Sequence, residues 1–196
     1  MKTIRQKLII PTIAIALVSV TACKDGSKNE PAAPMSNEMY QEPMDDKDDM
    51  SMSDNQDAKA EAILKDYFNL KDALVGDDND KAKEMGATLA NTLGSFDASS
   101  YSDSEQQDLK DIMEDAVEHA EHISESDIAH QREHFKVLSK DVIDMVAITG
   151  TEMKLYEQFC PMYDGGTAWL STKEEVRNPY YGSPMLKCGK VQREIN

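Results

Sequence analysis

Between residues 57 and 150, apolar side chains recur at spacings of three and four, the period of one face of an α-helix. Polar breaks at residues 76–80, after Gly94 and at residues 124–127 divide this region into four segments. Their apolar stripes contain, in chain order, Ala60, Ile63, Leu64, Tyr67, Phe68 and Leu74; Ala82, Met85, Leu89 and Leu93; Leu109, Ile112, Met113, Ala116, Ala120 and Ile123; and Ile128, Phe135, Leu138, Val142, Met145 and Val146. Because the connections are short, the pattern predicts an antiparallel four-helix bundle.

Local signals mark the ends of these predicted helices. The Gly-Asp-Asp-Asn-Asp turn at residues 76–80 supplies an N-cap, and it lacks the ligand series of a calcium-binding EF-hand loop. Ser102 and Glu105 have the spacing of a capping box. Gly150 is expected to end the last helix as its C-cap.

After Gly150 the helical period disappears. Residues 151–196 contain several turn signals and short extended pieces such as Thr167–Leu170, and they are too few to fold alone. We therefore predict a mainly α protein whose C-terminal segment, irregular with short strands, packs on the bundle. Trp169, Leu170 and Tyr180 are expected in the core that joins the two parts, and Arg132 is expected to bind a carbonyl or carboxylate of the tail.

The first 22 residues have the pattern of a signal peptide: a short basic region precedes an apolar run too short to span a membrane comfortably. The run ends in Val-Thr-Ala-Cys at residues 20–23, which resembles the lipobox of bacterial lipoproteins. In such proteins cleavage occurs before the cysteine, here Cys23, which carries the lipid. Two or more acyl chains give stable membrane anchoring. The alternative is an ordinary signal peptide followed by a chance cysteine.

Residues 23–56 are expected to form a disordered tether, because they contain three prolines and almost no large aliphatic side chain. The tether is nevertheless rich in methionine: Met35, Met39, Met44, Met50 and Met52. Thioether sulfur is a soft ligand suited to Cu(I) and Ag(I). The alternative is that these methionines reflect only the drifting composition of a linker. The predicted organisation is thus signal peptide (1–22), tether (23–56) and folded domain (57–196).

The chain is strongly acidic. Residues 1–22 carry three basic and no acidic residues, so their removal takes the formal net charge from −16 to −19. Such a protein is not expected to bind nucleic acid, and it should meet anionic lipid only through its anchor. The acidity by itself does not establish metal binding.

Two cysteine–methionine pairs stand out in the tail. Cys160 is followed by Pro and Met162, and Met185 precedes Cys188 by three positions. If the two segments meet, two thiols and two thioethers surround one point, which suits Cu(I) or Ag(I) better than zinc. In an oxidising compartment, however, two remaining cysteines also fit a Cys160–Cys188 disulfide.

All four histidines lie in the third and fourth predicted helices. His130 and His134 are four residues apart and share a helix face. We therefore add His134, and then His130, to the candidate ligands, whereas His119 and His122 have weaker support. No catalytic motif accompanies these residues, so the sequence favours a binding protein over an enzyme.

The tail motifs resemble an uncharacterised family of exported bacterial domains that occurs as lipoproteins and as an extension of membrane fusion proteins in CusB-type heavy-metal efflux systems. The motifs that carry the resemblance are Phe-Cys-Pro-Met at 159–162, Trp-Leu-Ser at 169–171, Asn-Pro-Tyr-Tyr-Gly at 178–182 and Met-Leu-x-Cys-Gly at 185–189, with weaker similarity at 66–74 and 131–135. The first also resembles the Cys-Pro-Met-His start of a short heavy-metal-binding domain, although Tyr163 replaces the histidine here, and no methionine follows Gly189. The resemblance implies a helical periplasmic domain, a metal-efflux partner and no reaction.

Together these features predict a lipoprotein of the cell envelope, anchored most simply at the periplasmic face of the outer membrane. Its expected cargo is Cu(I) or Ag(I), for sequestration or delivery to an efflux system. The rival prediction is a structural or interaction lipoprotein with a Cys160–Cys188 disulfide and no metal.

Overall fold

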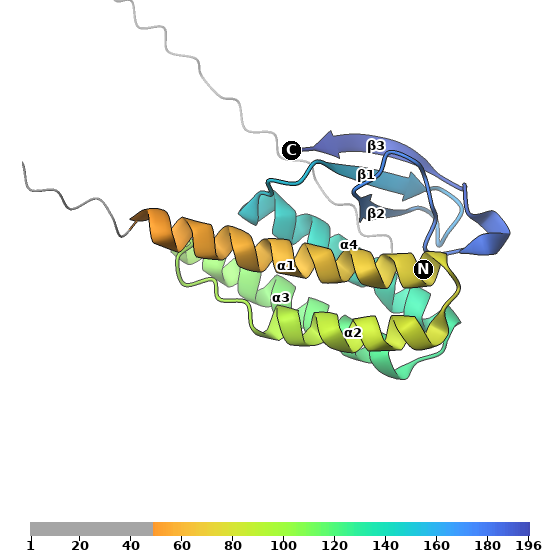
Figure 1. Cartoon of the computed structure of the whole chain (residues 1–196), viewed down its shortest axis with the longest axis horizontal. Coiled ribbons are helices and arrows are strands. Elements are labelled where there is room, and N and C mark those ends of the chain that lie inside the picture. The colour runs from red at the N-terminus through yellow and green to blue at the C-terminus, as the bar shows by residue number, and fades with distance from the viewer. Residues whose placement is uncertain (1–48) are drawn as a thin grey trace, which may run out of the picture. The chain divides into compact units, whose positions relative to one another are not determined.

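The computed structural model describes residues 49–196, with side chains from residue 58 onward. Predictions for the signal peptide, for Cys23 and for most of the tether lie outside the described residues. Four helices come first in the chain: α1 (Asp49–Val75), α2 (Asn79–Gly94), α3 (Asp103–Glu125) and α4 (Ile128–Thr149). Three strands and a short 3₁₀-helix follow: β1 (Leu155–Cys160), β2 (Thr167–Ser171), η1 (Ser183–Met185) and β3 (Lys190–Ile195). The predicted mainly α fold, a bundle with a C-terminal segment packed on it, is confirmed (Figure 1).

The helix ends follow the local sequence signals. The Ser102 and Glu105 side chains form the expected capping box, and Gly150 ends α4 with a φ of 70°. One boundary differs from the prediction: α1 begins at Asp49 and not at residue 57. The first residue of α1 is an aspartate, a residue type that is favoured at the N-terminal end of a helix, where the dipole is positive.

Each helix buries one stripe of apolar side chains and exposes the opposite face. Consecutive helices pack against each other, and α1 also contacts α4, which closes the bundle. None of the helices in the described part of the chain combines the length and the apolar character needed to cross a membrane.

Residues 155–195 form an antiparallel sheet in the order β2–β1–β3. Cys160 pairs with Thr167 on one side of β1, and Phe159 pairs with Lys190 on the other. A bulge between Glu157 and Gln158 shifts the register of β1 against β3. The sheet lies over the side of the bundle formed by α1 and α4 (Figure 1), with β2 against α4.

Aromatic side chains join the sheet to the bundle. Trp169 and Tyr180 are buried, as predicted, and the Tyr180 ring packs against Phe135 of α4. Tyr67 of α1 stacks on Phe135, shares a hydrogen bond with the Ser139 hydroxyl (2.9 Å) and accepts one from the backbone N–H of Leu170 (3.1 Å). These contacts fix the tail to α1 and α4.

Gly86 allows α2 and α3 to approach closely. A Cβ at this position would lie 2.9 Å from Ile123 Cγ2, 3.0 Å from the Ala120 carbonyl and 3.1 Å from the Ser124 nitrogen. Two of these atoms belong to the backbone of α3, so they cannot move aside as the end of a flexible side chain would.

We expect Gly86→Ala to destabilise the fold by about 1 kcal/mol, because overpacking costs about 1–3 kcal/mol and the gain in helix propensity offsets about 1. Gly94→Ala is the matched control, since a Cβ there meets nothing within 4 Å. It should be neutral or stabilising in urea unfolding experiments. Equal effects of the two substitutions would show that the close approach of α2 and α3 does not limit stability.

Candidate functional site

The pairing of β1 with β3 brings the two folded-domain cysteines together. Cys160 ends β1 and is buried, whereas Cys188 lies in the turn that leads into β3. The two Sγ atoms lie 3.1 Å apart and are not bonded. This separation exceeds the bond of about 2.05 Å in a disulfide. It is shorter than the roughly 3.8 Å between two sulfurs on a tetrahedral ion with metal–sulfur bonds of about 2.3 Å.

The two thiols have different environments. Burial raises the pKa of Cys160, but hydrogen bonds to its sulfur outweigh burial and lower the pKa overall. The donors are the Cys188 thiol, the backbone N–H groups of Met162 and Tyr163, and the Asn178 side chain. The pKa of Cys188 is raised, mainly by its hydrogen bond to Cys160. The pKa values of the two thiols are therefore shifted in opposite directions, that of Cys160 below and that of Cys188 above the ordinary value of cysteine.

The two predicted methionine ligands lie in the same two segments as the cysteines: Met162 follows Cys160, and Met185 precedes Cys188. Met162 is 63% exposed and Met185 is 39% exposed. They are the two large apolar side chains exposed in the described part of the chain. The segments that carry the two thiols thus each present an exposed methionine as well.

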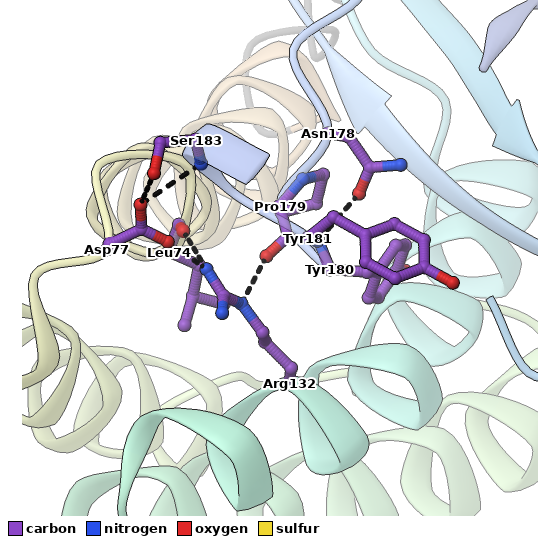
Figure 2. A network of polar contacts seen from close by, with 8 residues as sticks. All are labelled: Leu74, Asp77, Arg132, Asn178, Pro179, Tyr180, Tyr181 and Ser183. Atoms are coloured by element: carbon purple, nitrogen blue, oxygen red, sulfur yellow. Dashed lines mark hydrogen bonds and ion pairs between the residues drawn. The ribbon is translucent and has the colours of Figure 1, made fainter. Parts of the chain in front are cut away.

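The loop of residues 178–188, which contains η1 and ends at Cys188, is folded around the side chain of Asn178. Its amide oxygen accepts hydrogen bonds from the backbone N–H groups of Tyr180 (2.8 Å) and Tyr181 (3.1 Å), as Figure 2 shows. Its amide nitrogen donates to the Cys188 carbonyl at 2.7 Å. The loop that carries Cys188 is therefore closed by a buried side chain.

Arg132 of α4 ties this loop to the bundle, as the sequence predicted. Its Nε donates to the Pro179 carbonyl, and its Nη2 donates to the Leu74 carbonyl, each at 2.9 Å. Nη2 also binds the Asp77 carboxylate, whose other oxygen accepts from the Ser183 backbone N–H (Figure 2). The pKa of Asp77 is lowered by its hydrogen bonds with the side chains of Ser183 and Arg132.

Gly182 is required where the loop passes this ion pair. Its φ is 58°, and a Cβ there would collide with Asp77 Oδ1 and Arg132 Nη2. The glycine therefore lets the loop approach the α1–α2 turn closely enough to be held by it.

The predicted histidine ligands lie elsewhere, between α3 and α4. His134 Nδ1 faces His119 Nδ1 at 2.8 Å, and His134 Nε2 faces His130 Nε2 at 3.0 Å. The His122 ring stacks on His134, with ring centroids 4.6 Å apart. Burial and then the neighbouring imidazoles lower the pKa of His134. Among the described contacts, these side chains interact with one another and with nearby carboxylates, not with either cysteine.

The histidine cluster does not present three nitrogen atoms to one point, because His119 and His130 contact opposite nitrogens of His134. Across the described residues, no group of three or more His, Cys, Asp or Glu side chains has the geometry of a metal site. A metal ion held by Cys160 and Cys188 would therefore take any further ligand from a methionine, from solvent or from another molecule.

Asp141 is a buried ionisable group that is not among the residues predicted from the sequence. It lies on the apolar stripe of α4, three residues after Leu138 and four before Met145, and its Oδ2 has no hydrogen-bond partner. Burial raises its pKa to about 7, and the negative charge of Asp115 adds to the effect. A charged residue at a stripe position was the signal that could have identified it.

Comparison with protein families gives one match. Residues 63–154 match the model of a family described as a protein of unknown function, DUF3347. The match supports the predicted resemblance to an uncharacterised domain family over the bundle, and it ends before β1, so it contains neither Cys160 nor Cys188. Searches of curated proteins and of solved structures found no significant match.

We expect Arg132→Ala to lower the free energy of unfolding by about 1–3 kcal/mol, because it leaves the Pro179 and Leu74 carbonyls without their donor and removes the counter-ion of the exposed Asp77. Amide hydrogen exchange should increase in residues 178–189. Lys140→Ala is the matched control on the same helix, since Lys140 pairs with Asp144 at the surface and should contribute less than about 1 kcal/mol. Unchanged exchange in the loop would contradict the assignment of Arg132 as its anchor.

Asp141 should make stability depend on pH. The folded state retains a proton that the unfolded state, with an aspartate pKa of about 4, releases, so stability should fall as pH rises from about 4 to about 7. Asp141→Asn should therefore stabilise the protein at pH 8, by on the order of 2 kcal/mol, and change little at pH 4. Thermal unfolding at both pH values measures this, with Asp144→Asn as the surface control. An equal change at both pH values would exclude titration of Asp141 as the cause.

Proposed function

We propose that the folded domain binds a soft monovalent metal ion, Cu(I) or Ag(I), as cargo through the sulfur atoms of Cys160 and Cys188. The observation that carries this proposal is the approach of two unbonded cysteine sulfurs to 3.1 Å. Thiolates are the ligands that such ions prefer, and these ions accept low coordination numbers. Zinc has less support, because no further His, Cys, Asp or Glu side chain completes a site with the pair in the described residues.

Binding requires a small opening of the pair. The sulfurs would have to separate from 3.1 Å to about 3.8 Å around a tetrahedral ion and further around a linear one. Cys188 is the more exposed of the two cysteines, and rotation about its Cα–Cβ bond moves its sulfur without moving the strands. Its proton is released when it becomes a ligand.

Met162 and Met185 are the proposed additional ligands. Both thioethers are exposed, and neither needs deprotonation to bind a soft ion. Neither methionine is among the residues that form the apolar core or pack against it, and a ligand role would account for a methionine close to each cysteine in the sequence.

The proposed cellular role is that of a binding protein rather than an enzyme. The lipobox ending at Cys23 supports anchoring at the cell envelope, and the methionines of residues 23–56 support loose capture of the same ions. Sequestration, or delivery to a membrane fusion protein of a heavy-metal efflux system, then follows from the resemblance of the tail motifs. The histidine cluster is not included in this site.

A second candidate function uses the same geometry. The two sulfurs would need to approach by only about 1 Å to form a disulfide, and an oxidising compartment favours that outcome. The protein would then be a structural or interaction lipoprotein whose tail is covalently closed.

Anaerobic titration of the reduced mature protein with Cu(I), against a competing chelator, tests the proposal. We expect one tight site, and we expect a Cys160→Ser, Cys188→Ser double variant to bind at least about 100-fold more weakly, since both soft anionic ligands are lost. A Met162→Leu, Met185→Leu double variant should bind about 3- to 10-fold more weakly, with Met153→Leu as the matched control.

Tight binding that survives the double cysteine substitution would overturn the proposed site, and so would equal affinity of wild type and double variant. Circular dichroism of each variant checks that the helices remain folded. Counting free thiols in protein isolated from the envelope without reductant separates the two functions. Two free thiols per folded domain favour the metal site, and a quantitative Cys160–Cys188 crosslink favours the structural lipoprotein.

A further inference from the structure

Asn178 is fully buried, and its backbone closes the loop that carries the second cysteine. Its N–H donates to the Leu186 carbonyl at 2.8 Å, and its own carbonyl accepts from the Gly182 N–H at 3.1 Å. Residues 178–186 are thus closed on themselves before the chain reaches Cys188.

The side chain of Asn178 has two separate roles. Its amide oxygen forms the turn by accepting from Tyr180 and Tyr181, the pair of bonds drawn in Figure 2. Its amide nitrogen donates to the Cys188 carbonyl at 2.7 Å and is also a hydrogen-bond partner of the Cys160 sulfur. The side chain therefore holds the Cys188 backbone directly and also affects the Cys160 thiol, although the two cysteines are 28 residues apart in the chain.

The turn alone does not require asparagine. Aspartate forms the same kind of turn, because only an acceptor oxygen is needed there. At the nitrogen position, however, a carboxylate would oppose the Cys188 carbonyl oxygen and the Cys160 sulfur, both of which accept hydrogen bonds. Only a carboxamide supplies an acceptor to the turn and a donor to the two cysteines.

We propose that Asn178 is the positioning residue of the dithiol site: its carboxamide holds the Cys188 backbone and the Cys160 sulfur in one unit, so that only the Cys188 side chain moves when an ion enters. This inference rests on the proposed function for its role in metal binding. Its structural part, the link between the two cysteines, does not depend on any metal.

The link explains which sulfur stays in place. The Cys160 sulfur accepts hydrogen bonds from Met162, Tyr163 and Asn178 as well as from Cys188. Turning Cys188 toward an ion removes one of these donors and leaves the other three. Cys160 is therefore the fixed ligand of the pair, and Cys188 is the mobile one.

The test compares Asn178→Asp with Gln131→Glu in the full mature chain. Both substitutions replace a buried amide with a carboxyl group that faces backbone carbonyls, and Gln131 donates to the carbonyls of Asn79, Ile123 and Ser126, away from the cysteines. The first readout is the alkylation rate of each thiol by iodoacetamide, resolved by peptide mass spectrometry. The second is the Cu(I) dissociation constant.

We expect Asn178→Asp to change the ratio of the Cys160 and Cys188 alkylation rates by about fivefold or more and to weaken Cu(I) binding about tenfold or more, because it replaces the amide donor to the Cys188 carbonyl with a carboxyl oxygen. Gln131→Glu should lower stability and leave both readouts unchanged. Asn178→Ala, which also loses the turn, should change the alkylation ratio in the same direction.

An alkylation ratio in Asn178→Asp equal to that of wild type would overturn the inference, as would the same change in Gln131→Glu. If wild type does not bind Cu(I), the proposed function fails, and the alkylation ratio alone decides the role of Asn178. If Cu(I) binds and the ratio is unaffected, the metal site stands and Asn178 does not position it.

Discussion

Burial of Trp169 and Tyr180 against the side of the bundle formed by α1 and α4 is the interaction on which the candidate site depends. Residues 151–196 hold too few apolar side chains to fold alone, so their order comes from this shared core. Tyr67 adds a specific polar contact, because its hydroxyl accepts the backbone N–H of Leu170 within β2. β1 pairs with β2 on one side and with β3 on the other, and the β1–β3 pairing brings the segment of Cys188 beside Cys160.

The helical part of the fold was predictable because its signals are local. Apolar stripes at a spacing of three and four, the Ser102–Glu105 box and Gly150 each act within a few residues, and all are confirmed. The strands were mostly not predictable. β3 is largely exposed and polar, and the bulge at Glu157 and Gln158 interrupts the alternation of β1, so neither has the two-residue period of a half-buried strand. Their pairing is decided by the bundle surface beneath them.

Some features of the candidate site were also predictable from the sequence, and others were not. That Cys160 and Cys188 might meet was visible in the sequence, since each lies beside a methionine in a turn-rich tail, and so was the contact from Arg132 to a tail carbonyl. The sequence did not show that the histidines lie apart from the cysteines. They do so because the face of α4 that carries His130 and His134 packs against α3, which carries His119. Asn178 was identified only as the first residue of the Asn-Pro-Tyr-Tyr-Gly motif, since its contact with the Cys188 carbonyl depends on a long-range arrangement that no local pattern encodes.

The family match and the candidate chemistry occupy different parts of the chain, and the contacts between the parts explain how one supports the other. The matched segment, residues 63–154, supplies Tyr67, Asp77 and Arg132. These three side chains hold the unmatched tail at β2, at Ser183 and at Pro179 respectively. Two of these three contacts, at Pro179 and at Ser183, are made to the loop that carries Cys188, and none of the three is made to Cys188 itself. The bundle therefore fixes the frame of the dithiol pair through contacts that do not involve the Cys188 side chain, which is compatible with the proposal that this side chain turns when an ion enters or leaves.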